Sequence, residues 1–527
     1  EIMDYKVGLF GKNKSYTLKE SMEACIELKN QLKSIFGPGS HDQYVIEENG
    51  QITLSNDGYT VLSKLCIENP MAQLLRDTSQ GIDKIVGDGT TSVVILTGCL
   101  LEEAKQLMED YQIHPMTIIR EFNYIFDTYI LKELESIKSG INDNFSQEQR
   151  VRSLIHTVLQ SKLERDISIQ HTIYDAMKKT QWRYDHQTTC KIKFIECTNL
   201  SKTTLLSNDD IVLPLYQPAV LPSSFRAVFI SLPKDLFASS KKSSRRNREE
   251  QLVQNYLFKK NGGIHQEKRL ETWLKHLLRF LITKRIQVVF IDHISYSHIQ
   301  STLNEIRPNV VFVQIHTTNK NYLKNHFSID FFTENPLVHS MTHVEIQDCP
   351  SGSFLFSRMA HPEVPFATLL VGGQNELATS EVVRALHDVL CVLHRSLHVS
   401  KELIYGGGHA ELHMVHFLKN VVIPIYVSKG QFNTVTCIRG LVKAFLGLPQ
   451  ALVPQEAILF KALKMVKDNK KVGLSLHNPS TPQCIDFLKD PHLSIFELYI
   501  NKLDQWKAAM ISTSQLLKIH VVISLDA

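Results

Sequence analysis

Residues 87–111 read GDGTTSVVILTGCLLEEAKQLMEDY, and this stretch decides the fold of the first part of the chain. Two glycines flank Asp88, two threonines follow, and a periodic apolar run then predicts a long helix. Glycines let a backbone approach phosphate oxygens closely, and the N–H groups at a helix start bind anions. The stretch therefore predicts either a phosphate loop or an ordinary capped turn, and it lacks the GK[ST] of a Walker A loop.

Helical patterning continues on both sides of this stretch. Residues 17–36 carry apolar residues at helical spacing and stop at Gly37-Pro38-Gly39. Residues 44–55, YVIEENGQITLS, favour a hairpin. The helical pattern returns from about residue 379, and residues 520–526, HVVISLD, favour a strand. Both ends of the chain are therefore predicted to be mainly helical.

The middle of the chain has a different pattern. Short apolar stretches rich in β-branched residues alternate there with helical segments, which is typical of a layered α/β domain. These stretches are CKIKFIEC at 190–197, RAVFISL at 226–232, IQVVFID at 286–292 and NVVFVQIH at 309–316. Helical ends around an α/β centre predict one domain built from both termini, with the middle inserted into it.

Composition narrows the functional classes. The chain has 527 residues and a net charge of +4, which argues against a dedicated nucleic-acid binder. Its nine cysteines include no CxxC pair, so neither a zinc site nor a redox dithiol is indicated, and a reducing compartment is expected. No apolar run approaches the ~20 residues of a membrane helix, and the first residues lack a signal-peptide core. We therefore expect a cytosolic protein.

Seven short motifs follow one another along the chain. They are GPG at 37–39, NDG at 56–58, GDGTTSVV at 87–94, HP at 114–115, TVLQSK at 157–162, RALHDVLCVL at 384–393 and YGGGHAEL at 405–412. As an ordered set they resemble the group II chaperonins, and the subunits of the eukaryotic chaperonin TRiC/CCT in particular, over roughly residues 15–165 and 365–527. The start of the chain resembles the theta subunit, whereas the two last motifs resemble beta or epsilon, so the paralogue stays open.

The resemblance implies a multidomain α and α/β chaperonin fold. It would have a helical equatorial domain, a small intermediate domain and an α/β apical domain. The implied segments are 1–140 and 399–527 for the equatorial domain, 141–205 and 356–398 for the intermediate domain, and 206–355 for the apical domain. The basic run at 241–248 lies where the family has its lid protrusion, near residues 239–263. A solvated insertion and a substrate-facing basic patch stay open as alternatives.

The resemblance also implies residues that bind the phosphates of ATP. Gly37 and Pro38 match a loop around the phosphates. The phosphate loop itself is matched by Gly87, Asp88, Gly89, Thr90, Thr91 and Ser92. Asp88 is the implied Mg²⁺ ligand, since Mg²⁺ prefers carboxylate and phosphate oxygens.

Other implied roles concern hydrolysis and the nucleoside. Asp57 matches an aspartate near the γ-phosphate, and Asp388 matches the carboxylate that activates the attacking water, so both are candidate catalytic residues. Lys162 matches a lysine that senses the γ-phosphate. Gly407 and Gly408 match the glycines against the base and sugar. Glu497-Leu498 stands where the family has an aspartate–proline pair, and Glu497 would still reach the ribose.

The chain departs from the family pattern at several positions. Ser40 and Gln43 stand where the first loop has glycine and lysine, and Ser475 stands where an aspartate is expected. Gly372-Gly373 replaces an arginine–glycine pair. Because the three aspartates are retained, we expect weakened ATP binding with hydrolysis preserved.

The leading interpretation is an ATP-dependent subunit of a double-ring hetero-oligomer in the cytoplasm, acting with ATP and Mg²⁺, with or without K⁺. Paralogous chaperonin subunits and unfolded clients such as cytoskeletal proteins would be its partners, and neither nucleic acid nor a membrane would be. The alternative is a chaperonin-like structural or assembly factor with weakened or lost ATPase. A metabolic kinase is disfavoured, since nothing resembles a small-substrate pocket.

Overall fold

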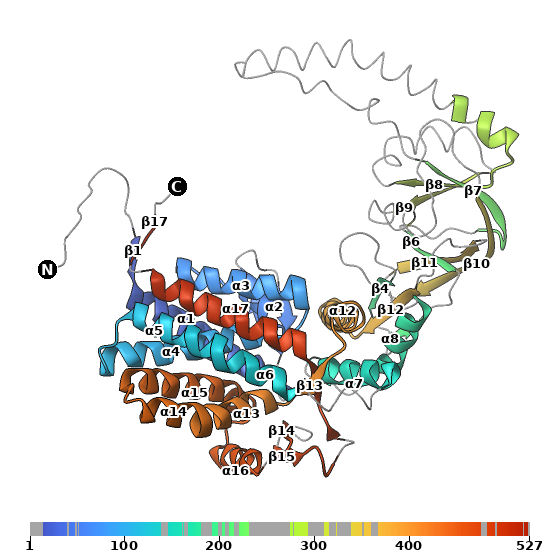
Figure 1. Ribbon diagram of the computed structural model, residues 1–527. Helices are drawn as coiled ribbons and strands as arrows, with labels where there is room; N and C mark the ends of the chain where they lie inside the picture. The colour runs from blue at the N-terminus through green and yellow to red at the C-terminus, as the bar shows by residue number, and fades with distance from the viewer. Residues whose placement is uncertain are drawn as a thin grey trace, which may run out of the picture. The chain divides into compact units, whose positions relative to one another are not determined.

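The computed structural model describes residues 14–138, 146–180, 192–230, 275–292, 310–315, 323, 339–359 and 367–524, with short gaps inside these ranges. Figure 1 shows the chain coloured along its sequence. The expected lid segment, residues 239–263, lies outside the described residues.

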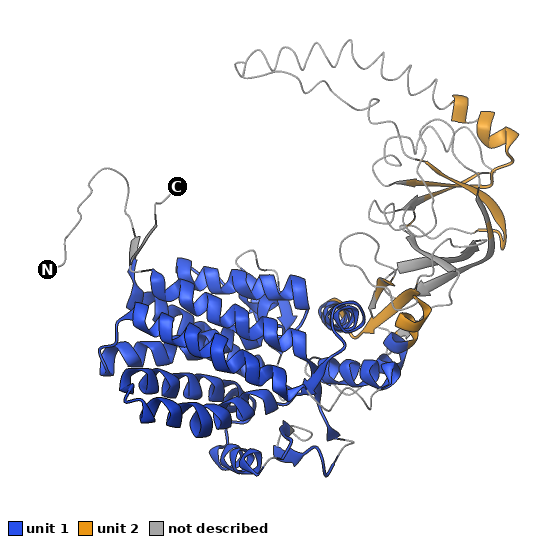
Figure 2. Cartoon of the chain, in the orientation of Figure 1, with its two compact units in different colours: residues 1–174, 377–527 blue, residues 175–376 orange. Residues whose placement is uncertain are grey.

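The chain divides into two compact units (Figure 2). One unit comprises residues 1–174 and 377–527, and the other comprises residues 175–376. Both ends of the chain thus fall in the first unit. The finer division into equatorial, intermediate and apical domains stays a prediction.

The first unit is a helical bundle around α4 (Thr90–Asp110). This helix is buried on nearly all sides, including every residue from 93 to 101, as a helix that is apolar all round should be. It packs against α1 (Leu18–Leu32), α3 (Pro70–Val86), α15 (Phe432–Leu452) and α17 (Tyr499–Lys518). The apolar run that follows the GDGTT turn therefore forms the centre of the core.

Further helices complete this unit. They are α2 (Gly58–Lys64), α5 (Pro115–Ile125), α6 (Leu131–Ile137), α7 (Gln147–Gln160), α13 (His409–Phe417), α14 (Ile423–Ser428) and α16 (Glu456–Lys467). Two π-helical turns, η2 (Phe126–Ile130) and η5 (Leu418–Val422), join α5 to α6 and α13 to α14, and the short 3₁₀ helix η1 (Lys33–Ile35) follows α1. Helices α8 (Ile167–Lys179) and α12 (Glu376–His398) cross the boundary between the units.

The first unit also contains short two-stranded sheets. The hairpin predicted at 44–55 is formed by β2 (Gln43–Ile46) and β3 (Ile52–Ser55). The other antiparallel pairs are β1 (Lys14–Thr17) with β17 (Val521–Ser524), β13 (Leu403–Tyr405) with β16 (Phe496–Leu498), and β14 (Val472–Ser475) with β15 (Gln483–Asp486).

The second unit contains the predicted α/β middle. A six-stranded sheet has the order β6-β11-β10-β7-β8-β9. Its strands are β6 (Asp210–Leu215), β7 (Phe225–Ile230), β8 (Val288–Asp292), β9 (Val311–Ile315), β10 (His339–Cys349) and β11 (Gly352–Met359). The β7, β8 and β9 strands are parallel, which explains their continuous apolar sequences. A second sheet joins β4 (Ile192–Thr198), β12 (Ala367–Gly373) and β5 (Thr204–Leu205).

One helix of the bundle has the length and composition of a membrane span. Helix α15 has a mean hydropathy of 1.2 over its most apolar window, and 61% of that window is buried inside the protein. The expectation that no apolar segment reaches this length was therefore too strict. Burial against α4 and α13 is the behaviour of a core helix.

Candidate nucleotide site

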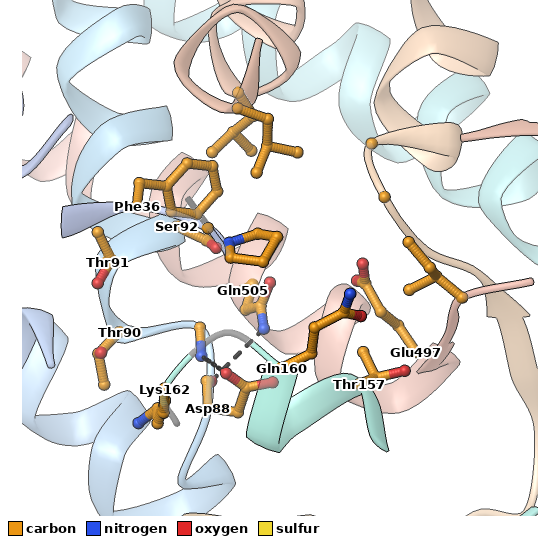
Figure 3. A pocket seen from close by; sticks show the side chains of 18 of the residues that line it. Phe36, Asp88, Thr90, Thr91, Ser92, Thr157, Gln160, Lys162, Glu497 and Gln505 are labelled. Atoms are coloured by element: carbon orange, nitrogen blue, oxygen red, sulfur yellow. Dashed lines mark hydrogen bonds between the residues drawn. The ribbon is translucent and has the colours of Figure 1, made fainter. Parts of the chain in front are cut away.

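One cavity of the helical unit gathers most of the residues named from the motifs (Figure 3). Its wall includes Gly37, Pro38, Asp57, Asp88, Gly89, Thr90, Thr91, Ser92, Lys162, Gly407, Gly408 and Glu497. Gly87 and Asp388 do not line this cavity. Each is next to a lining residue: Gly87 precedes Asp88 in the chain, and Asp388 accepts a hydrogen bond from Lys162. Motifs separated by several hundred residues thus meet at one place.

The predicted phosphate loop is a tight turn between two helices. Helix α3 ends at Gly87 with φ 70°, and Gly89, with φ 80°, precedes the first turn of α4. Both residues occupy the left-handed region that favours glycine. A Cβ at Gly87 would also lie 2.4 Å from the Cβ of Cys391, so the turn is packed closely on α12. Because residues 90–92 open a long helix here, their N–H groups form a site suited to phosphate oxygens.

Lys162 joins the two predicted catalytic carboxylates. Its Nζ lies 3.3 Å from Oδ1 of Asp57 and makes a short hydrogen bond with Oδ2 of Asp388. Asp57 also accepts from the Thr90 hydroxyl at 3.2 Å, and from the Thr60 backbone N–H at 2.9 Å as the cap of α2. The three charged side chains are each at most 10% exposed. The NDG and GDGTT motifs are therefore joined by a direct hydrogen bond.

Burial and charge act in opposite directions in this cluster. Burial alone would raise the pKa of Asp57, but the Lys162 ammonium and the Thr60 N–H bring that pKa below its ordinary value. Burial alone would lower the pKa of Lys162, but Asp388, Asp57 and Asp88 raise it well above its ordinary value. One ammonium thus stays charged opposite three carboxyl groups. This excess of negative charge suits a site that also takes a cation.

Asp88 is the residue best placed to hold such a cation. Burial raises its pKa, with Lys162 opposing that effect, and its Oδ1 accepts the Gly89 N–H at 2.7 Å. Within the described residues, no group of three or more His, Cys, Asp or Glu side chains forms a complete metal cage. Mg²⁺ is commonly held by one or two carboxylates together with phosphate oxygens and water, so this donor set fits it.

Asp83, one helical turn before the loop on α3, belongs to the same charge cluster but was not predicted from the motifs. Burial raises its pKa to about 6, and the charges of Asp57 and Asp388 add to that effect. An acid with a raised pKa in the folded protein stabilises the fold at low pH. This contribution is complete below the ordinary value of 3.8 and is lost as the pH rises through about 6.

Asp83→Asn should therefore stabilise the nucleotide-free chain at pH 7 and change little at about pH 3, where the carboxyl is protonated in both the folded and the unfolded chain. A shift of about two units corresponds to about 3 kcal/mol, and partial exposure of the carboxyl reduces the expected gain to about 1 kcal/mol. Denaturant unfolding at the two pH values measures this difference. Asp110→Asn, at the exposed end of α4, is the matched control. An equal effect of Asp83→Asn at both pH values would contradict the assignment.

Two glycines and several apolar side chains also line the cavity. Gly407 and Gly408, with φ 62° and 78°, turn the chain into α13, and the Leu474 N–H donates to the Gly407 carbonyl at 2.8 Å. The apolar lining residues are Ile35 and Phe36, next to Gly37 and Pro38, together with Leu448, Leu452, Leu474 and Ile495. A flat aromatic base would fit against such a surface.

Several lining residues were not assigned a role from the sequence. Asn56, Thr157, Gln160 and Glu411 lie inside the quoted motifs, whereas Lys502 and Gln505 lie outside them. Gln505 lies directly on the phosphate loop, since its Nε2 is 3.5 Å from the Asp88 carbonyl and a Cβ on Gly89 would lie 1.9 Å from it. Their spacing gives a partial signal, since Thr157 and Gln160 are three residues apart, as are Lys502 and Gln505.

The departures at the first loop have local structural roles. Gln43, where the family pattern has lysine, donates from Nε2 to the Ser34 hydroxyl at 2.9 Å and does not line the cavity. The Ser40 N–H donates to the Gly37 carbonyl at 3.1 Å, which closes the turn on itself. At position 43 this loop therefore lacks the positive charge of the family pattern. The hydrogen bonds of Gln43 and Ser40 are made to neighbouring residues of the protein.

Comparison with known proteins agrees with the motifs. The sequence model of the TCP-1/cpn60 chaperonin family matches residues 28–213. T-complex protein 1 subunit delta of Yarrowia lipolytica is 27% identical over 439 residues, which cover 78% of this chain and 79% of that protein. The same subunit of Debaryomyces hansenii is 26% identical over 76% of each chain.

Archaeal relatives match more strongly over a shorter stretch. Thermosome subunit gamma of Saccharolobus shibatae is 41% identical over 149 residues. This match covers 28% of this chain and 26% of that protein. The specific paralogue is not determined by these relatives. The motif order and the helical unit agree with these matches, and the chain is similar to the TCP-1/cpn60 chaperonin family over residues 28–213 and to T-complex protein 1 subunit delta along most of its length.

Proposed function

We propose that this chain is an ATP-hydrolysing subunit of a cytosolic chaperonin of the TRiC/CCT type. The observation that carries the proposal is the bonding of Lys162 to both Asp57 and Asp388 beside the start of α4. Side chains from three distant motifs are bonded to one another there, and in this proposal they would act on the terminal phosphate. Such an arrangement suits phosphoryl transfer, which depends on positioning and on stabilising charge.

Each part of the cluster has a chemical task in this proposal. The N–H groups and hydroxyls of Thr90 and Thr91 would bind phosphate oxygens. Asp88 would hold Mg²⁺, which neutralises charge that develops on the phosphates. Asp388 would orient the attacking water and accept its proton, with Asp57 beside it. Lys162, now bonded to the two carboxylates, would turn toward the γ-phosphate when nucleotide is bound.

Hydrolysis would drive a change between open and closed forms of a ring, as a population shift between two states. We infer that the ring contains paralogous subunits, because the relatives that match most of the chain are T-complex protein 1 subunits. Unfolded proteins, including cytoskeletal ones, are the proposed clients, and the cytoplasm is the proposed location. Neither nucleic acid nor a membrane is a proposed partner.

A chaperonin-like assembly factor without turnover is the second candidate. The missing lysine at Gln43 and the serine at 475 favour it, whereas the retained aspartates favour hydrolysis. The mass of the native particle together with the ATPase rate of this subunit separates the two. A particle without turnover at this subunit would support the second candidate.

Asp88→Ala should weaken Mg²⁺-ATP binding by about tenfold or more, because loss of one charged ligand costs about 1.5–3 kcal/mol. Titration of nucleotide into the purified particle, with and without Mg²⁺, measures the effect. Asp77→Ala, an exposed carboxyl on α3, should leave affinity unchanged. Equal Mg²⁺ dependence in the Asp88→Ala protein and the unmodified protein would contradict the metal role.

A further inference from the structure

A buried lysine connects three elements at the wall of the cavity. Nζ of Lys502, on α17, lies 2.6 Å from Oε2 of Glu497 on β16 and 3.1 Å from Oε1 of Glu411 on α13. The lysine side chain is 8% exposed. Burial alone would lower the pKa of Lys502, but the two carboxylates raise it, so the ammonium stays charged.

The two carboxylates of this cluster are not equivalent. Glu411 is 2% exposed, and its Oε1 also accepts the Trp506 indole N–H at 3.3 Å, so the protein itself satisfies this group. Glu497 is 26% exposed and lines the cavity, as Figure 3 shows. Both glutamates line the cavity, but Glu497 is the more exposed of the two and is therefore better placed to meet a ligand.

Glu497 is held from two directions. Lys502 fixes Oε2, while Oε1 lies against the backbone of Gly406, where an added Cβ would be 2.7 Å away. Gly406 directly precedes Gly407 and Gly408, the glycines of the cavity wall. Without Lys502, two carboxylates would face each other with no compensating charge, and the more exposed Glu497 would turn outward.

We propose that Lys502 is a positioning residue for the sugar contact that the resemblance implies for Glu497: it fixes this carboxylate as a preformed acceptor for the two hydroxyls of a ribose diol. A carboxylate accepts hydrogen bonds and donates none, and the neighbouring 2′- and 3′-hydroxyls of a ribose are paired donors. A preformed acceptor gains affinity because it need not be ordered on binding. The inference rests on the proposed function, in which this cavity binds ATP.

The experiment compares two competitors for the same site. The full chain carries an affinity tag and is purified in its native complex. Photolabelling with an azido-ATP is then read on the band of the tagged subunit, so that other subunits do not contribute. ATP and 2′,3′-dideoxy-ATP are the competitors, and the readout is the ratio of their half-inhibiting concentrations.

In the unmodified chain, dideoxy-ATP should compete about tenfold less well than ATP, since hydrogen bonds to a charged group are lost. Lys502→Met should bring this ratio to about one, because the acceptor is no longer held. Lys502→Arg, which keeps the charge, should retain most of the preference. Lys507→Met, on the exposed face of the same helix, is the matched control and should retain all of it.

Gly406→Ala provides a second route if Lys502→Met fails to enter the complex. It keeps every buried charge but displaces the tip of Glu497, so the ratio should also fall. Equal weakening of both nucleotides by Lys502→Met or Gly406→Ala, with the ratio retained, would show a structural role and overturn the inference.

The test also separates the inference from the proposed function. Labelling of the unmodified chain with a ratio of one would overturn sugar selection by Glu497 and leave ATP binding intact. A complete lack of ATP-sensitive labelling on this chain would instead overturn the proposed ATP site, and the inference with it.

Discussion

Asp388→Ala is expected to lower ATP hydrolysis by this subunit about a hundredfold or more while leaving its affinity for Mg²⁺-ATP nearly unchanged. Asp388 lies behind the cavity wall and is 8% exposed, with its Oδ2 bonded to Lys162. Of the residues proposed to bind phosphate and metal, Lys162 bonds this carboxylate, but it also bonds Asp57 at 3.3 Å, which would still hold it. Its loss should therefore remove activation of water without removing the binding contacts.

Single-turnover hydrolysis, measured on particles in which only this subunit is altered, separates the two effects. Asp127→Ala, an exposed acid in the π-helical turn after α5, is the control and should keep both rate and affinity. Turnover at the unmodified rate in the Asp388→Ala protein would show that another group activates the water.

Deletion of residues 521–527 is expected to prevent the chain from entering its particle. Strand β17 pairs with β1, and this is a two-stranded sheet within the described residues. An isolated pair of strands is marginally stable, and its open edges favour pairing with another chain. In the proposed ring, a strand of the neighbouring subunit would cover one edge, and assembly would stabilise the fold by mass action.

Size-exclusion chromatography with mass spectrometry measures this effect. The intact chain should elute near a megadalton, the size expected for a double ring of ~60 kDa subunits, whereas the truncated chain should be absent from that fraction. Deletion of residues 525–527 alone retains β17 and should permit assembly. Normal assembly of the longer deletion would exclude the strand from the subunit contact.

The sequence predicted the parts of the site that consist of contiguous motifs. Glycine positions and apolar spacing predict the GDGTT turn, the hairpin before it and the long helix after it, because these signals lie in short contiguous stretches. The resemblance supplied what spacing cannot, namely that Asp57, Lys162 and Asp388 belong to one site. Taken alone, an acid on an apolar helix such as α12 is expected on its solvent face, yet Asp388 is buried.

Other parts depend on packing between distant segments and leave little local signal. Lys502 and Gln505 lie more than 400 residues after Asp88, and they reach the cavity because α17 packs against α4. Asp83 acquires its raised pKa from burial and from neighbours on other elements. The strands β10 and β11 carry polar residues among apolar ones, so the pattern that identified β7, β8 and β9 did not identify them.

The central claim is that this subunit binds ATP where the three aspartate motifs meet, and an image of the native particle tests it most directly. Particles would be trapped with ADP, Mg²⁺ and a phosphate mimic and imaged by electron cryomicroscopy with this chain tagged. We expect nucleotide density against residues 89–92, a metal density beside Asp88, and Lys162 moved from Asp388 toward the mimic. An empty cavity in the tagged subunit, with nucleotide present in its neighbours, would contradict the claim.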